Sequence, residues 1–487
     1  MRETINIVWF KKDLRLTDHA PLSDAVKSGL PVLLLHFFEP SLMAAADSDE
    51  RHWRFIYESV EEMNAKLFQQ QIHFFSLHAE VVPVLHALLT HFNIHTIFSH
   101  EETGNAISYG RDNAVNIFCK QNRIRWKEYA TNGIIRGLKS RRTWSEQWTE
   151  TMTADVIAVP LSAIRSVQLP ASFNNCLATS ILPQSIRKKN PLFQPGGETT
   201  AWRYLSSFFN ERCTTYSKHI SKPEESRKSC SRISPYLTYG NISMKQVYQA
   251  TLQAIAETSF KRPLQFFIAR LHWHCHFIQK FESECRMEFE NLNRGFDAIR
   301  ININEQYVAA WKNGVTGVPL IDACMRCVTQ TGYLNFRMRS MLASFLTHHL
   351  WQPWQAGAAH LAKQFLDYEP GIHYPQFQMQ AGTMGVHTIR IYNPVKQGKE
   401  HDPYGLFIKK WIPELANVPV EFIHEPWQMS EMEQQLHSIQ LGIDYPLPII
   451  DIQKAAAFAR KHLWDAKKTT AVNIENKRVL EVHTKRR

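Results

Sequence analysis

The fold is decided by the stretch from residue 331 to residue 382, which reads TGYLNFRMRSMLASFLTHHLWQPWQAGAAHLAKQFLDYEPGIHYPQFQMQAG. Apolar residues recur at helical spacing between Leu334 and Leu346, and this pattern predicts a buried helix. Arg337 and Arg339 lie among them, and buried guanidiniums require an anionic partner. The segment therefore predicts a core helix that meets negative charge.

A second predicted helix, residues 356–366, is followed by Asp367 and Glu369 before Pro370-Gly371 ends it. A helix macrodipole disfavours carboxylates at a C-terminus, so these two also need a partner. An arginine–aspartate pair between the two helices satisfies one charge of each sign, and breaking such a buried pair costs about 3–5 kcal/mol. A polar, charged ligand between the helices would use the remaining guanidinium and carboxylate.

Length and charge set broad limits on the protein. A chain of 487 residues with 44% hydrophobic and 21% charged residues predicts two or more globular domains. The formal net charge of +11 favours a polyanionic partner such as DNA, although a basic surface without a partner is equally consistent with charge alone. We find no signal peptide and no apolar run of about 18 residues, which predicts a cytoplasmic protein with no membrane partner.

The first part of the chain alternates short apolar strands with helices. Such alternation predicts an α/β domain with a doubly wound, Rossmann-like parallel sheet over residues 1–131, although no Gly-x-Gly-x-x-Gly motif follows the first strand. The predicted strands are 5–10, 32–38, 73–77, 95–99 and 125–129, and the predicted helices are 21–28, 54–70, 80–92 and 106–120.

Beyond residue 131 the pattern changes. Periodicity fades and prolines accumulate over residues 132–195, which predicts an interdomain linker. Residues 196–470 then predict an all-helical domain, and residues 471–487 a basic C-terminal tail.

Metal binding is not predicted. Of the eight cysteines only Cys324 and Cys327 have metal-like spacing, and without a second such pair they are better explained as core thiols. His272 and His276 share a helix face, but no third ligand has matching spacing, so both are interpreted as cavity-lining or structurally bonded histidines.

A hydroxyl-rich turn, residues 230–237 (CSRISPYL), opens a predicted helix. Free N–H groups and the dipole at a helix start suit a phosphate, with Arg232 as reinforcement, while a plain capping turn explains the same residues equally well.

Seven motifs, in this order along the chain, carry a resemblance. They are 8–18 (VWFKKDLRLTD), 195–198 (PGGE), 231–237 (SRISPYL), 311–323 (WKNGVTGVPLIDA), 337–339 (RMR), 390–394 (RIYNP) and 401–405 (HDPYG). On the basis of these seven motifs and their order, the chain resembles the photolyase and cryptochrome family of blue-light flavoproteins. The resemblance implies an α/β domain followed by an all-helical domain that holds FAD in a U-shaped form, and a possible second, antenna chromophore of unknown identity near residues 9–18.

The resemblance also implies a set of cofactor contacts. Tyr216, Ser231 and Ser234 would contact the FAD diphosphate, with Arg232 and Ile233 shaping the same turn. The remaining implied contacts lie at the flavin: the Arg339–Asp367 salt bridge beside it, Glu369 near the isoalloxazine edge, and His373 facing N5. An imidazole at that last position can change charge near neutral pH and would serve as a proton donor. The alternative is a ring that is turned away and bonded to the backbone, since ring orientation cannot be read from sequence.

The substrate side departs from the family pattern. The implied DNA-facing positions are Arg270, Trp273, Phe336 and Met379. Family members that repair cyclobutane dimers carry glutamate, asparagine and methionine where this chain has Arg270, Phe336 and Ser340. Those that repair (6-4) photoproducts carry a histidine pair at Asn335-Phe336. Neither lesion-binding pattern is intact.

The electron path of the family is also altered. Trp354 keeps the middle tryptophan position, but Phe377 occupies the flavin-proximal one and Ile301 the surface one. Trp354, Phe377 and His373 are therefore the candidate catalytic positions, and electron supply must be rerouted through Trp351, Tyr368 or Tyr374, slowed, or unused.

These features favour a DNA photolyase, a carbon–carbon lyase that transfers an electron from reduced FAD to a pyrimidine lesion in damaged DNA under blue light. The alternative is a cryptochrome photoreceptor without repair activity. A light-independent flavin electron-transfer protein is a third possibility, which leaves the basic charge unused.

Overall fold

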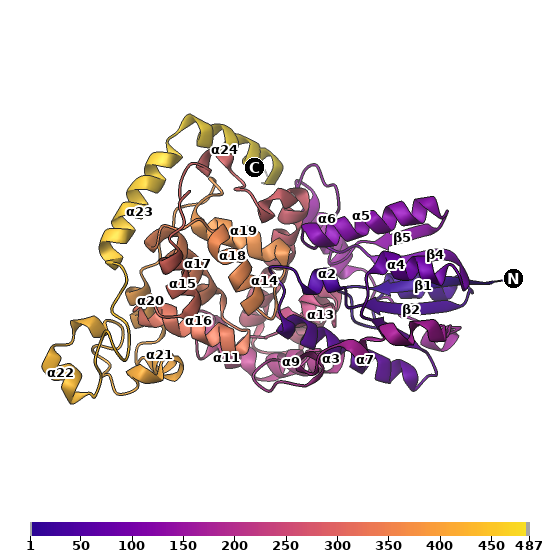
Figure 1. Cartoon of the computed structure of the whole chain (residues 1–487), viewed down its shortest axis with the longest axis horizontal. Coiled ribbons are helices and arrows are strands. Elements are labelled where there is room, and N and C mark those ends of the chain that lie inside the picture. Colours follow the sequence, from indigo (N-terminus) through magenta and orange to yellow (C-terminus); the bar gives the residue numbers. More distant parts are fainter. Residues whose placement is uncertain (1, 484–487) are drawn as a thin grey trace.

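The computed structural model describes residues 2–483, which form an α/β part and a larger helical part packed against it (Figure 1). Five parallel strands form one sheet in the order β3-β2-β1-β4-β5. The strands are β1 (Glu3–Phe10), β2 (Val32–Phe37), β3 (Phe74–Leu77), β4 (Phe92–His100) and β5 (Arg125–Tyr129). The predicted doubly wound parallel sheet is confirmed.

Helices cover both faces of this sheet because its central strands are apolar on both sides. In β1, Val8 and Phe10 join one buried cluster, while Ile7 and Trp9 point to the opposite face and join another. The covering helices are α1 (Ala20–Lys27), α3 (Glu50–Phe68), α4 (Val81–Leu88) and α5 (Ala106–Gln121), with the short α2 (Pro40–Met43) between α1 and α3.

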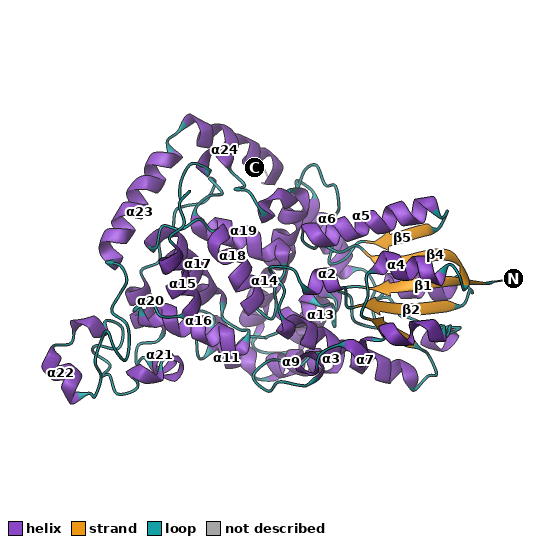
Figure 2. Cartoon of the chain, viewed as in Figure 1, coloured by secondary structure: helices purple, strands orange, loops and turns teal. Residues whose placement is uncertain are grey.

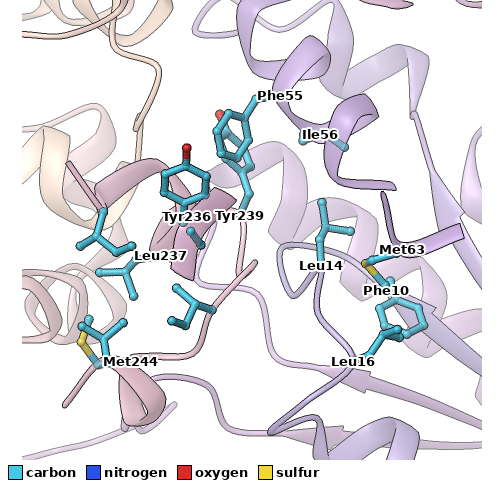
Figure 3. Close-up of a cluster of buried hydrophobic side chains, with 14 of the residues drawn as sticks. Phe10, Leu14, Leu16, Phe55, Ile56, Met63, Tyr236, Leu237, Tyr239 and Met244 are labelled. Carbon is cyan, nitrogen blue, oxygen red and sulfur yellow. The ribbon is translucent and has the colours of Figure 1, made fainter. Parts of the chain in front are cut away.

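One apolar cluster runs without interruption from the sheet into the helical part. Phe55 of α3 packs against Tyr236 and Tyr239, with ring centroids 5.2 and 5.0 Å apart, and Leu14 lies beside them (Figure 3). The two parts therefore share one hydrophobic core, and this core fixes the α/β part against the helical part.

Residues 132–195 differ from the predicted linker because they are packed on both parts. Trp144, Trp148 and Met152 are buried along one face of α6 (Trp144–Thr153), which packs on α13 (Met244–Glu257). Further along, single β-bridges join Val32 to Ser166 and Leu77 to Leu177, and the short α7 (Ala178–Ile181) and α8 (Gln184–Arg187) follow.

Between residue 130 and residue 483 the structure contains helices and no named strand (Figure 2). Besides α13 they include α9 (Glu198–Asn210), α10 (Tyr216–His219), α11 (Ser226–Ser229), α12 (Ser234–Thr238), α14 (Lys261–Ser283), α15 (Glu305–Asn313), α16 (Pro319–Thr331), α17 (Phe336–Ser344), α18 (Gln355–Gln364), α19 (Pro370–Ala381), α20 (Pro394–His401), α21 (Leu406–Trp411), α22 (Glu431–Leu436), α23 (Ile452–Lys467) and α24 (Thr470–His483). None of the helices described is long and apolar enough to cross a membrane.

The central stretch forms three helices. The first, α17, continues into a π-helical turn, Phe345–His349, before α18 begins. The third, α19, packs against both α14 and α17. Glu369 corrects the expectation of a misplaced carboxylate: it lies at the N-cap of α19, where the dipole favours negative charge, and Asp367 lies in the turn before it.

Residues 471–483 form most of α24 and do not extend as a tail. Val472 and Val479 are fully buried, and Arg478 and His483 both bind Glu284, at 2.8 and 2.6 Å. This helix folds back over the helical part along with α23 (Figure 1). The last four residues of the predicted tail, 484–487, lie outside the described residues.

Candidate functional site

A partly buried ion pair between α17 and the turn before α19 forms the centre of the site. Arg339 Nη2 donates to Asp367 Oδ2 at 3.0 Å, Nη1 lies 2.9 Å from Oδ1, and Arg339 Nε donates to the carbonyl of Leu334. Burial by itself would raise the pKa of Asp367, but Arg339 and the Ser234 hydroxyl more than offset it and hold that pKa below its usual value. The predicted arginine–aspartate pair is confirmed, and Asp367 is ionised at neutral pH.

Arg337 does not share this partner and corrects the expectation that both arginines meet charge between the helices. Its guanidinium lies over the ring of Tyr392, 5.3 Å from the centroid, and its side chain lines an open pocket of about 470 Å³. Arg390, Arg460 and Trp464 line the same pocket. The last two are one helical turn apart on α23, and they could not be predicted as site residues because no motif contains them and only their spacing marks them.

The hydroxyl-rich turn lies beside the ion pair. Ser231 and Ser234 flank Arg232, whose backbone adopts a left-handed conformation, φ 59°, and whose guanidinium stacks on Tyr333 at 3.6 Å. Arg232 Nη2 donates to Gln194 Oε1 at 2.7 Å, but its buried Nε has no hydrogen-bond partner among residues 2–483.

The hydroxyl-rich turn and the ion pair form one wall of the site, and buried side chains of neighbouring helices complete it. Ile233 and Tyr216 are buried beside the turn. His274 of α14 and Ser340 of α17 each bury a polar atom, Nδ1 and Oγ, that has no hydrogen bond within the described chain. Asp367 acts electrostatically on both Arg232 and His274. Unsatisfied buried polar atoms beside cationic side chains suit a ligand that is both polar and anionic, so these residues fit the diphosphate and ring system of FAD.

Glu369 lines a small polar cavity between the helical part and the carboxyl ends of the strands. Lys12, Thr238 and His274 line the same cavity. Burial raises the pKa of Glu369 to about 7, because only the distant Lys12 and the Gly371 N–H favour its charged form. A carboxyl group of this kind can hold or release a proton near neutral pH.

His373 is buried in the same wall and is bonded to the backbone, as in the alternative given for it, and not free to donate a proton to a ligand. Its Nε2 lies 2.9 Å from the carbonyl of Ala358, so this nitrogen carries the proton and donates it to the backbone. Burial lowers the pKa of His373 to about 4, and the Ala358 carbonyl only partly opposes that shift. The expectation of a charge change near neutral pH is therefore corrected: the imidazole is neutral there, with its donor already engaged.

Aromatic side chains surround His373. The centroid of its ring lies 5.1 Å from that of Phe377, 5.2 Å from that of Tyr368 and 5.4 Å from that of Tyr374. Trp354 is buried 6.2 Å from Tyr374 and donates from Nε1 to Asn291 Oδ1 at 2.9 Å. The structure thus brings together Trp354, Phe377 and His373, whereas Ile301 is 71% exposed.

The predicted DNA-facing residues lie on α14, α17 and α19, which pack side by side. Trp273 and Phe336 are each 50% exposed, Arg270 is exposed over Phe266, and Met379 is half-buried. Large exposed rings on adjacent helices suit contact with flat, unstacked bases.

Two histidine clusters bear on metal binding. His276 Nδ1 accepts a hydrogen bond from Arg141 at 2.7 Å, which fills a ligand position, and His272 packs on Trp144 and Trp148. Both contacts suit the structural roles expected of these histidines.

A second cluster, Asp13, His19 and His100, was not recognised in the sequence because its members are far apart along the chain. His19 Nδ1 accepts from the Leu22 N–H, so His19 Nε2 carries the proton and donates to Asp13 Oδ2 at 2.9 Å, and His100 Nδ1 lies 2.7 Å from the same oxygen. A metal at His19 Nε2 would require a doubly deprotonated ring, so hydrogen bonding explains this cluster better than a metal.

Comparison with known proteins places this geometry in context. Residues 6–149 match the family model described as DNA photolyase, and residues 267–465 match the FAD binding domain of DNA photolyase. A deoxyribodipyrimidine photo-lyase of Alkalihalophilus pseudofirmus is 27% identical, with 93% of this chain and 96% of that protein covered. A cryptochrome DASH of Synechocystis is also 27% identical, with 93% and 97% covered. The crystal structure of the Synechocystis cryptochrome superposes with a TM-score of 0.85 at 23% identity, covering 95% and 99% of the two chains, which confirms the fold.

Proposed function

Because the chain belongs to the photolyase and cryptochrome family, we propose that it is an FAD-dependent photolyase that repairs pyrimidine lesions in DNA under blue light. One observation carries the proposal: the partly buried Arg339–Asp367 pair lies in a wall of unsatisfied polar atoms. Exposed rings lie on α14 and α17, and the basic pocket joins α17 to α23. A second, light-harvesting chromophore near residues 9–18 stays a prediction.

The residues of the site divide by task. Tyr216, Ser231, Arg232, Ile233 and Ser234 would hold the diphosphate, since the left-handed turn and its hydroxyls present donors there. The other cofactor contacts would be Arg339, Asp367, Glu369 and His373. Bound FAD would supply one-electron chemistry on illumination.

The chain's own side chains would position the cofactor and exclude water. The ion pair holds α17 against the turn before α19. Glu369, with a pKa near 7, can hold a proton at the cofactor's edge, while neutral His373 offers only Nδ1 as an acceptor. We therefore assign the proton-holding role to Glu369 and a positioning role to His373.

DNA would bind over the exposed rings and the arginine pocket. Phosphates lead duplex binding, and Arg337, Arg390 and Arg460 offer three guanidiniums beside the aromatic Trp464. A lesion that is already poorly stacked flips out at low cost, and Trp273 and Phe336 would receive it.

The decisive experiment illuminates the FAD-loaded protein with oligonucleotides that carry either a cyclobutane dimer or a (6-4) photoproduct. Restoration of the parent bases, measured by chromatography, is expected for one of them, with none in the dark. Absence of repair for both, together with equal affinity for damaged and intact DNA, would overturn the proposal.

Salt dependence tests the DNA-binding surface separately. Arg460→Gln should weaken binding to every sequence and reduce the slope of log affinity against log salt by roughly 1, as expected for one lost phosphate contact. Lys461→Gln, on the same helix but outside the pocket, is the matched control. An unchanged slope in Arg460→Gln would remove the pocket from the binding surface.

A photoreceptor without repair activity is the second candidate. The feature that favours it is the substrate face, where this chain has Arg270 and Phe336 at positions that, by the family resemblance, hold glutamate and asparagine in dimer-repairing members. Light-dependent change in protease sensitivity or partner binding, in a protein that repairs neither lesion, would support this role.

A further inference from the structure

Two buried tyrosines beside the proposed flavin site share a carboxylate from the α/β part. Tyr368 donates from its hydroxyl to Asp47 Oδ2 at 2.5 Å, and the Tyr368 and Tyr374 hydroxyl oxygens are 3.4 Å apart. Asp47 also accepts from Asn105 Nδ2 at 2.9 Å, which fixes the carboxylate. The sequence pointed to Tyr368 and Tyr374 only as two of three alternative electron carriers, and it gave no role to Asp47 or Asn105.

The arrangement suits loss of an electron from a phenol. Burial raises the pKa of both Tyr368 and Tyr374, and the Asp47 charge raises it further, so neither phenol ionises on its own. Removal of one electron makes a phenol a strong acid, and in a buried site its proton needs an acceptor within hydrogen-bond reach. Asp47 occupies that place for Tyr368.

The tyrosines are connected to the candidate electron path. The Tyr374 ring lies 6.2 Å from Trp354 and 5.4 Å from His373, and Tyr368 lies 5.2 Å from His373. They therefore contact two of the candidate catalytic positions. Phe377 and Ile301, where relatives carry tryptophan, have no easily oxidised ring.

Trp351 is the competing donor, and its surroundings disfavour oxidation. The Arg300 guanidinium lies over its ring, 4.7 Å from the centroid, and a cation over a π face opposes the positive charge left by electron loss. Its ring neighbours are Phe458 and His462 on α23, and neither is a candidate electron carrier. The geometry therefore favours Tyr374 over Trp351.

We propose that Tyr374 and Tyr368 supply the electron that Trp354 loses toward the photoexcited flavin, with Asp47 as the proton acceptor. The electron passes from Tyr374 to the oxidised indole while Tyr374 keeps its own O–H bond, and an electron from Tyr368 then restores Tyr374. In the same process the Tyr368 O–H bond breaks and an Asp47 O–H bond forms, which leaves a neutral tyrosyl radical. An external thiol returns the electron, and Asp47 returns the proton to Tyr368.

The inference rests on the flavin photochemistry proposed above and not on the choice of lesion. It is tested in the FAD-loaded full chain without DNA, by flash excitation followed by transient absorption and electron paramagnetic resonance. The wild-type protein should show a tryptophanyl signal that decays into a tyrosyl signal. Decay should slow at least twofold in D₂O, because an O–H bond breaks.

Variants assign the signals. Tyr374→Phe should lengthen the tryptophanyl lifetime at least tenfold and abolish the tyrosyl signal, and Asp47→Asn should slow its formation without removing the partner of Tyr368. Tyr404→Phe, at a tyrosine that is 67% exposed, and Trp351→Phe should match wild type. Where Tyr374→Phe loses FAD, Tyr368→Phe provides the same test.

The outcomes separate the two proposals. A wild-type protein that gives a tryptophanyl signal but no tyrosyl signal, or an undiminished tyrosyl yield in both tyrosine variants, would overturn the relay and leave the light chemistry standing. No radical of either kind from fully flavin-loaded protein would instead count against the light-driven function itself.

Discussion

Replacing Asp367 with asparagine keeps the size of the side chain but removes the carboxylate that pairs with Arg339. Loss of one member of a buried pair costs about 3–5 kcal/mol, because the other charge is left without a partner. The Arg339 side chain is 25% exposed, so solvent screens part of that charge, and we expect the lower end, about 3 kcal/mol. The Ser234 hydroxyl also loses a charged acceptor.

Two measurements separate the structural and ligand-binding consequences. Denaturant unfolding of the flavin-free protein reports the loss of the pair, and flavin fluorescence reports the FAD dissociation constant. If Asp367 also contacts the cofactor, the FAD dissociation constant of the folded variant should be at least tenfold higher than that of the wild type. Asp465→Asn, an exposed carboxylate on α23, is the matched control and should change neither quantity.

The contribution of Asp367 to the free energy of unfolding should decrease on acidification. The pKa of Asp367 is lowered in the fold, so its contribution is complete above the ordinary aspartate value near 3.9 and is lost as pH falls further. Wild type and Asp367→Asn should therefore differ at pH 7 and converge on acidification below about pH 4. A wild-type unfolding free energy and full flavin occupancy in the variant at pH 7 would refute the assignment.

Three further predictions concern stability. Asp322 accepts four hydrogen bonds, two of them through Thr316 and one from Tyr445, so Asp322→Ala should cost at least about 3 kcal/mol in denaturant unfolding and Tyr445→Phe about 1 kcal/mol. The pKa of His373 is lowered to about 4 in the fold, so the free energy of unfolding falls as pH drops from 6.5 and the unfolded imidazole gains a proton. His373→Asn should remove roughly 3 kcal/mol of this decrease between pH 6.5 and pH 4, measured by denaturant unfolding. A Cβ at Gly240, where φ is 69°, would lie 2.4 Å from the Lys12 carbonyl, so the melting temperature should fall in Gly240→Ala while the helical Gly110→Ala does not lower it.

Much of the fold follows from residue patterns that need no tertiary information. Strand β5 begins and ends at the predicted residues, and β2 is fully buried along its length, as its continuous apolar run indicates. The same logic failed for α6 because Trp144, Trp148 and Met152 recur at four-residue spacing within a polar segment. In α24 the surrounding charges likewise obscured two buried valines.

The site could be predicted only where charge made it conspicuous. Arg339 and Asp367 were recognisable because an apolar helix and a helix end rarely carry unpaired charge. The direction of the His373 ring was invisible, since the same side chain can face a ligand or a carbonyl. Asp47 could not be linked to Tyr368 from the sequence, because 321 positions separate them and no motif contains both.

The α/β part also holds the turn that carries Asp367, beside the proposed flavin site. Arg51 Nη1 donates to the carbonyl of Gln364, and His52 Nε2 lies 2.9 Å from that of Phe365. Because His52 Nδ1 accepts from the Asp49 N–H, its proton is on Nε2, and burial lowers the pKa of His52 to about 4, so this donor persists at neutral pH. The end of α18 is therefore held by neutral and cationic donors from α3, and Asp47 binds Tyr368 just beyond. The turn before α19 is thus anchored on one side by the ion pair to Arg339 and on the other by the α/β part, so the position of Asp367 depends on both parts of the chain.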